Sequence, residues 1–202
     1  GVINSNGNVV LTATGNSANI HAAEINADNV TLSATGKYSD IYLDGGDITA
    51  TGTLNVTTTG SNSGIFLDDA STARTHSAAD INITSASTAN PIEIQHASTV
   101  IEATGSGSAT TLNFDETTNP IVTGSTYTAG SSSTAGTITI DGDFTSVGTL
   151  RALGGLSGTI NIDYDNVDLD LTNVTLITSS SGGSGTITIT NDLPSGAADN
   201  GT

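Results

Sequence analysis

The chain has 202 residues with 20 acidic and 3 basic side chains, a net charge of −17, and no cysteine, methionine or tryptophan. Its only permanent cations, Lys37, Arg74 and Arg151, cannot form the basic patch that nucleic acid requires. The absence of cysteine also excludes disulfide frameworks and thiolate metal sites. The sequence contains no run of 18 apolar residues, so it predicts no membrane-spanning segment.

A phrase of about eight residues recurs along the first half of the chain. It occupies residues 8–15, 29–36, 53–60 and 80–87, so that successive copies start 21, 24 and 27 residues apart. Shorter phrases follow the second, third and fourth copies, at 40–44, 64–68 and 91–95. A second series follows at 137–141, 159–163 and 186–190, with spacings of 22 and 27 residues. Such a period indicates a repeat architecture.

Each phrase alternates apolar and polar residues, which is typical of a β-strand with one buried face. Val30 and Leu32 would share one face, as would Ile138 and Ile140. Glycine, asparagine, aspartate and serine separate the phrases and indicate turns. No segment shows an apolar stripe of helical period, so we expect almost no helix.

These features predict an all-β fold, a parallel β-helix or solenoid of about eight coils, because stacked coils join their apolar faces into one core. A β-sandwich of antiparallel strands is the alternative fold. We expect a single domain over 1–193, with irregular loops near 104–136, chiefly at 104–111 and 123–136. Residues 194–202 are expected to form a tail or linker.

The phrases at 29–36, 46–52 and 80–87 resemble the repeats of filamentous haemagglutinin-like exoproteins and related autotransporter passengers of Gram-negative bacteria. The resemblance is best over 8–105 and returns over 136–193. It implies a right-handed parallel β-helix that is secreted across the outer membrane and forms the shaft of a surface fibre or adhesin. It brings no catalytic residues with it.

Catalytic chemistry has little support in the sequence. His21, His76 and His96 are far apart and are expected to be solvated surface residues. No nucleophile elbow, zinc-protease motif or phosphate loop is present. A polysaccharide-acting β-helix enzyme remains an alternative, with carboxylate pairs at Asp68/Asp69, Asp141/Asp143 and Asp163/Asp165. We expect a protein that is not an enzyme.

The densest acidic stretch, residues 163–170, offers the one candidate metal site. Asp163 and Asp165 would share one strand face, and Asp168 and Asp170 would do the same. Carboxylate oxygens at this spacing suit Ca²⁺ if a neighbouring turn adds carbonyl ligands. The alternative interpretation is an acidic, solvated surface, and no other cofactor is expected.

The sequence therefore predicts a structural segment of a bacterial extracellular fibre, filament or adhesin shaft. Its partners would be other copies joined end to end, or neighbouring coils of a longer chain, because open strand edges favour pairing. The alternative function is adhesion, in which loops near 68–79 and 104–136 bind a surface receptor or carbohydrate. We expect an extracellular or cell-surface location.

Overall fold

The computed structural model describes residues 1–87, 90, 92–105, 109–116, 121–123, 126–131, 134–141, 144–146, 148–152, 158–164, 174–178 and 185–191. All regular secondary structure in these ranges is β-strand. In the same ranges, no helix is long and apolar enough to cross a membrane.

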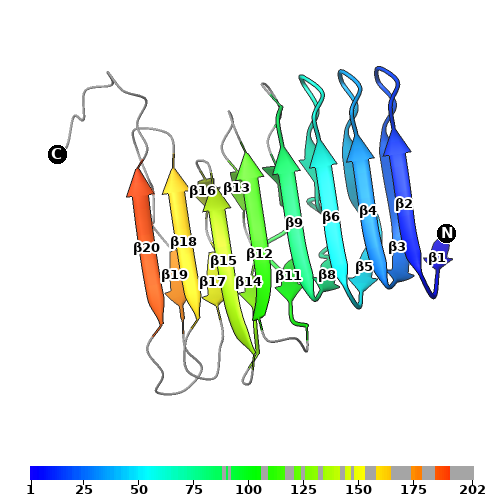
Figure 1. The fold of residues 1–202 in the computed structure, drawn as a ribbon. Helices are drawn as coiled ribbons and strands as arrows, with labels where there is room; N and C mark the ends of the chain where they lie inside the picture. The colour runs from blue at the N-terminus through cyan, green and yellow to red at the C-terminus, as the bar shows by residue number, and fades with distance from the viewer. Residues whose placement is uncertain are drawn as a thin grey trace, which may run out of the picture.

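Two sheets run along a stack of coils, and neighbouring strands in each sheet pair in parallel (Figure 1). The front sheet contains, in order, β2 (Asn8–Ala13), β4 (Asn29–Ala34), β6 (Thr53–Thr58), β9 (Asp80–Ser85), β12 (Ala109–Glu116), β15 (Ala135–Asp141), β18 (Thr159–Tyr164) and β20 (Thr186–Asn191). The back sheet contains β1 (Val2–Asn4), β3 (Ile20–Ala27), β5 (Ile41–Ala50), β7 (Ile65–Phe66), β8 (Thr75–Ala78), β10 (Ile92–Glu93), β11 (Val100–Ala103), β13 (Ile121–Thr123), β14 (Thr126–Ala129), β16 (Phe144–Ser146), β17 (Gly148–Ala152) and β19 (Val174–Ile177).

The back sheet divides at β5. The first residues of this ten-residue strand, Ile41 and Tyr42, pair with β7, whereas Ile48 and Thr49 pair with β8. From there, one column continues through β10, β13 and β16, and a second continues through β11, β14, β17 and β19. The residues between β7 and β8 are thereby placed at a corner of the coil.

The predicted phrases stack in register, which confirms the all-β parallel solenoid. Val30 lies between Val9 and Leu54, and Leu32 lies between Leu11 and Val56. These inward side chains line one continuous core that reaches Ile160 and Ile162 on β18; Leu11, on the end strand, is partly buried, and the others are buried. Since a sandwich needs antiparallel neighbours, the parallel pairing overturns that alternative.

The coil count differs from the prediction. About five turns are described, fewer than the eight coils expected, and the front sheet continues through eight stacked strands. The coils of β15, β18 and β20 are described mainly by their strands. At the parallel-strand spacing of about 4.8 Å, the seven intervals between eight strands span roughly 34 Å.

The interval 104–136, where we expected irregular loops, contains β12, β13 and β14 and the start of β15. The loop prediction was therefore too broad, because strands with short apolar alternation lie between the glycine- and serine-rich residues. The predicted tail, residues 194–202, lies outside the described residues.

Candidate functional site

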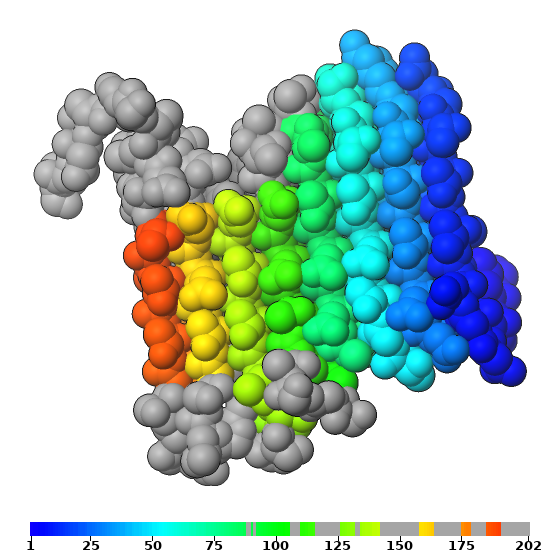
Figure 2. Space-filling model, viewed as in Figure 1, coloured from blue at the N-terminus to red at the C-terminus, as the bar shows by residue number. Residues whose placement is uncertain are grey.

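The outer surface of the front sheet carries three rows of side chains, each with one residue per coil, because alternate side chains of a strand point outward. Figure 2 shows this surface as a flat array. The rows are Asn8, Asn29, Thr53, Asp80, Thr111, Thr137, Thr159 and Thr186; Val10, Thr31, Asn55, Asn82, Asn113, Thr139, Asn161 and Thr188; and Thr12, Ser33, Thr57, Thr84, Asp115, Asp141, Asp163 and Thr190.

Asparagine side chains connect successive coils within two of these rows. The Nδ2 of Asn82 donates to Oδ1 of Asn55 at 3.0 Å, and Nδ2 of Asn113 donates to Oδ1 of Asn82 at 2.8 Å. In the first row, Nδ2 of Asn29 donates to Oδ1 of Asn8 at 2.9 Å. These amide contacts hold the coils in register in addition to the backbone pairing.

The predicted calcium ligands fall only partly within the described residues. Asp163 lies on β18, in the third row, next to Asp141 on the preceding coil. Its Oδ1 is buried without a hydrogen-bond partner among the described residues. Asp165, Asp168 and Asp170 lie outside those residues. No group of three His, Asp or Glu residues that could hold a metal occurs in the described part, and calcium binding stays a prediction.

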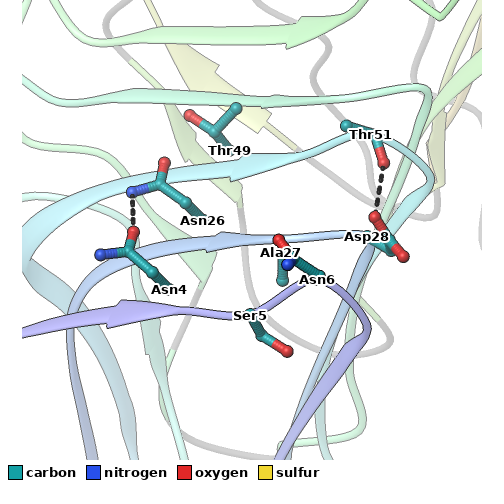
Figure 3. A pocket seen from close by; sticks show the side chains of 8 residues that line it. All are labelled: Asn4, Ser5, Asn6, Asn26, Ala27, Asp28, Thr49 and Thr51. Atoms are coloured by element: carbon teal, nitrogen blue, oxygen red, sulfur yellow. Dashed lines mark hydrogen bonds between the residues drawn. The ribbon is translucent and has the colours of Figure 1, made fainter.

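A shallow polar pocket of about 270 Å³ lies where the first three coils bend from the back sheet toward the front sheet (Figure 3). Its lining is Asn4, Ser5, Asn6, Asn26, Ala27, Asp28, Thr49 and Thr51. Asn26 Nδ2 donates to Asn4 Oδ1 at 3.0 Å, and Thr51 Oγ1 donates to Asp28 Oδ1 at 3.4 Å. The polar groups therefore contact one another from coil to coil, as the outer rows do.

The carboxylate pair Asp68/Asp69 separates into two unlike environments. Asp68 is buried, and its oxygens accept hydrogen bonds from the backbone N–H groups of Gln95 (2.6 Å) and His96 (3.0 Å) and from the hydroxyl of Thr99 (2.5 Å). Asp69 is at the surface, where the hydroxyl and backbone N–H of Ser71 hold its pKa below the usual range. Asp68 thus anchors one coil to the next through three donors.

His76 is buried at the corner where the back sheet divides, so the prediction of a solvated side chain was wrong. The backbone N–H of Ile48 donates to Nδ1 at 3.3 Å, so Nε2 carries the proton and donates to Leu67 O at 2.7 Å. Burial lowers the pKa of His76 from 6.5. The neutral ring is therefore the form that satisfies both contacts.

Arg74, the cationic side chain at this corner, is directed into the protein. Its guanidinium donates to the backbone oxygen of Asp44, and its backbone N–H donates to Thr99 Oγ1 at 3.0 Å. Together with Asp68 and His76, it fixes the segment between β7 and β8. This part of the predicted adhesive loop 68–79 therefore contributes to the fold.

Three rings stack along the outside of the back sheet. His21 is exposed and lies 4.6 Å from Tyr42, and Tyr42 lies 4.9 Å from Phe66, measured between ring centroids. Tyr42 donates its hydroxyl to Asp40 at 3.0 Å. Partial burial, this hydrogen bond and nearby carboxylates raise the pKa of Tyr42 to about 12. His21 is therefore one of three stacked rings that connect successive coils.

The turns that follow β2, β4 and β6 stack at one edge of the solenoid (Figure 1) and form what we call the turn ridge, residues 15–18, 36–39 and 60–63. A buried serine ladder lies beneath it. The hydroxyl of Ser39 accepts from Ala18 N–H at 3.1 Å, and the hydroxyl of Ser63 accepts from Ser39 N–H at 3.0 Å. Ser87 continues the ladder by accepting from Ser63 N–H at 3.1 Å.

The two ends of the described stack expose apolar residues. Ile187 and Ile189 on β20 are 45% and 42% exposed, although their register partners on β18, Ile160 and Ile162, are buried. At the other end, Ile3 is also exposed, and Val2 and Val10 are exposed at the register positions of the polar residues Glu24 and Thr31. In the front sheet, β2 and β20 each have one neighbouring strand.

Comparisons with known proteins identify no relative: no family model, no curated protein and no solved structure matches the chain.

Proposed function

We propose that this chain is a structural β-solenoid segment of a bacterial extracellular fibre, filament or adhesin shaft, and that it acts mechanically and not as an enzyme. The proposed location follows from the resemblance of residues 8–105 and 136–193 to filamentous haemagglutinin-like repeats. The observation that carries the proposal is the continuous apolar core, which runs from β2 to β18 and is still open at β20.

Such a core supports a stiff rod because three kinds of contact join neighbouring coils. Backbone hydrogen bonds run along the axis in both sheets, aliphatic side chains stack inside, and asparagine and serine ladders connect the coils at the surface and at the turns. Since each coil contacts only its neighbours, axial length is added without changing the cross-section.

The open apolar ends favour end-to-end growth. Stacking β2 of one copy on β20 of another would place Val9 near Ile187 and Leu11 near Ile189, an inward pattern like that between β18 and β20. The net charge of −17 disfavours side-by-side association, because the negatively charged flanks of two rods repel each other. Filaments would therefore lengthen more readily than they bundle.

A pair of lysine variants on β20 tests this assembly. In the double variant Ile187→Lys/Ile189→Lys, two ammonium groups would have to be buried at the end contact, which is costly without partners. The variant should remain a single chain in light scattering at concentrations where the unmodified protein assembles. Thr188→Lys is the matched control, because it adds charge to the same strand on the outward face and should assemble normally.

Two outcomes would contradict the assembly proposal. The first is an unmodified protein that stays monomeric at every concentration, and the second is a double variant that assembles as well as the Thr188→Lys control. Circular dichroism of each variant verifies that the solenoid is still folded, so that lost assembly is not confused with unfolding.

A further inference from the structure

Among the described residues, Tyr38 is the one large exposed apolar side chain that lies outside the strands at the two ends of the stack. Among the described residues, six such side chains are exposed, and Val2, Ile3, Val10, Ile187 and Ile189 all lie on β1, β2 or β20. Tyr38 lies instead on the turn ridge and is 49% exposed. Tyrosine is enriched at binding interfaces, which makes this ring a candidate contact.

The backbone at Tyr38 is unfavourable for a bulky residue. Its φ is 59°, in the left-handed region, as are Ser17 (57°) and Asn62 (63°) at the equivalent position of the neighbouring turns. Asparagine and glycine adopt this conformation most readily, whereas a large side chain is rare there. The turn would form more easily with asparagine, so the phenol ring is not required for the fold.

Lys37 adds a cation next to this ring. Its Nζ lies over the Tyr38 ring, 4.8 Å from the centroid, and its backbone N–H donates to Asn16 Oδ1 at 3.2 Å. The other cationic side chain that the structure describes, Arg74, donates to a backbone oxygen inside the fold. Lys37 is exposed, and in an acidic protein it gives this part of the ridge an ammonium donor.

We propose that the turn ridge around Tyr38 binds a neutral pyranose glycan. The C–H face of a pyranose ring packs on the negative face of an aromatic ring, and the turn backbone presents the Tyr38 ring rigidly. Lys37 contacts one face of the ring and restricts its orientation. The Lys37 ammonium and the side-chain amides of Asn16 and Asn62 on the adjacent turns donate hydrogen bonds to sugar hydroxyls. The net charge of −17 disfavours an anionic glycan at the same place.

This inference adds a binding function to the proposed shaft and does not depend on end-to-end association. It also places the contact on turns for which the sequence predicted no binding, and not on the loops 68–79 and 104–136. A shaft that displays such a contact would adhere along its flank.

The test uses the complete chain on a panel of immobilised glycans with matched neutral and carboxylate-terminated members. We expect binding to neutral pyranose glycans, with weaker binding to the carboxylate-terminated partners, most clearly at low salt. Tyr38→Asn should reduce binding at least about tenfold, the effect of losing an aromatic hot spot. Lys37→Gln should cause a smaller loss.

Thermal unfolding separates a binding role from a structural one. Tyr38→Asn should raise Tm by about 2–4 °C, because asparagine suits the left-handed backbone and this chain has about 200 residues. The matched control is Ser17→Asn, at the equivalent position of the previous turn, which should keep full binding.

Three results would overturn the inference: no glycan binding by the unmodified chain, equal binding by Tyr38→Asn, or preference for the carboxylate-terminated glycans. Failure of the rod to assemble would not bear on any of them.

Discussion

Removal of one hydroxyl from the buried serine ladder should destabilise the solenoid strongly. The Oγ of Ser63 accepts from the N–H of Ser39 at 3.0 Å and donates to the carbonyl of Gly36 at 3.1 Å. All of Ser63 is buried, so water cannot replace the hydroxyl in the folded state. Ser63→Ala would leave a donor and an acceptor unpaired inside the protein.

The size of the effect follows from these two groups. An unsatisfied buried polar group costs about 1–3 kcal/mol, so the two groups left by Ser63→Ala should lower the free energy of unfolding by about 2–6 kcal/mol. With a urea m-value of about 2 kcal/mol/M, the unfolding midpoint should fall by roughly 1–3 M. Urea titration followed by circular dichroism measures this shift.

Ser61→Ala is the control from the same turn. Ser61 is only partly buried, and substitutions at such surface positions usually change stability by less than about 0.5 kcal/mol. If Ser63→Ala unfolds at the same urea concentration as Ser61→Ala, the ladder does not stabilise the coils and the reasoning is refuted.

Three further predictions concern other coil contacts. A Cβ at Gly60 would overlap the carbonyl oxygen of Gly36, so Gly60→Ala should lower Tm or prevent folding, and an unchanged Tm would contradict the close approach. Burial lowers the pKa of His76 from 6.5 in the folded protein, so as the pH falls the His76 ring is protonated at a higher pH in the unfolded chain than in the folded one. The free energy of unfolding should thus decrease below pH 6.5, by up to about 1.4 kcal/mol per pH unit, and His76→Leu should flatten this slope in urea titrations. Thr110 is 1% exposed, and its Oγ1 has no hydrogen-bond partner among the described residues; Thr110→Val should raise the free energy of unfolding by about 1 kcal/mol, and a loss would indicate a partner beyond them.

The strands of the front sheet were predictable because their phrases repeat the same alternation. The phrases at 8–15, 29–36, 53–60 and 80–87 contain β2, β4, β6 and β9, and the later series contains parts of β15, β18 and β20. Neither series of phrases predicted β12. This strand follows a glycine- and serine-rich stretch and has Phe114 where the other front-sheet strands have an aliphatic residue. Its register with Ile83 places it in the same column.

The buried corner was not predictable from local sequence. His76 follows Arg74 and Thr75 and precedes Ser77, and a lone histidine among polar residues is typical of a loop. Its burial arises because β5 is long enough to pair with both β7 and β8, so that Ile48 lies beside His76. That pairing joins residues 28 positions apart and has no signal in either segment alone.

The turn ridge did leave a signal in the sequence. Residues 15–18, 36–39 and 60–63 all begin with glycine, and the second and third end with serine. Aligning them places Tyr38 opposite Ser17 and Asn62, the position that the structure shows to be left-handed. What the alignment does not give is the burial of Ser39 and Ser63, which depends on how the turns stack.

The central claim is that the chain builds a continuous axial stack, and electron microscopy of the purified protein with fibre diffraction tests it most directly. The account predicts straight, uniform filaments that lengthen with protein concentration and give an axial repeat of about 4.8 Å, the spacing of parallel strands along the rod. Particles no longer than a single chain at every concentration would contradict it.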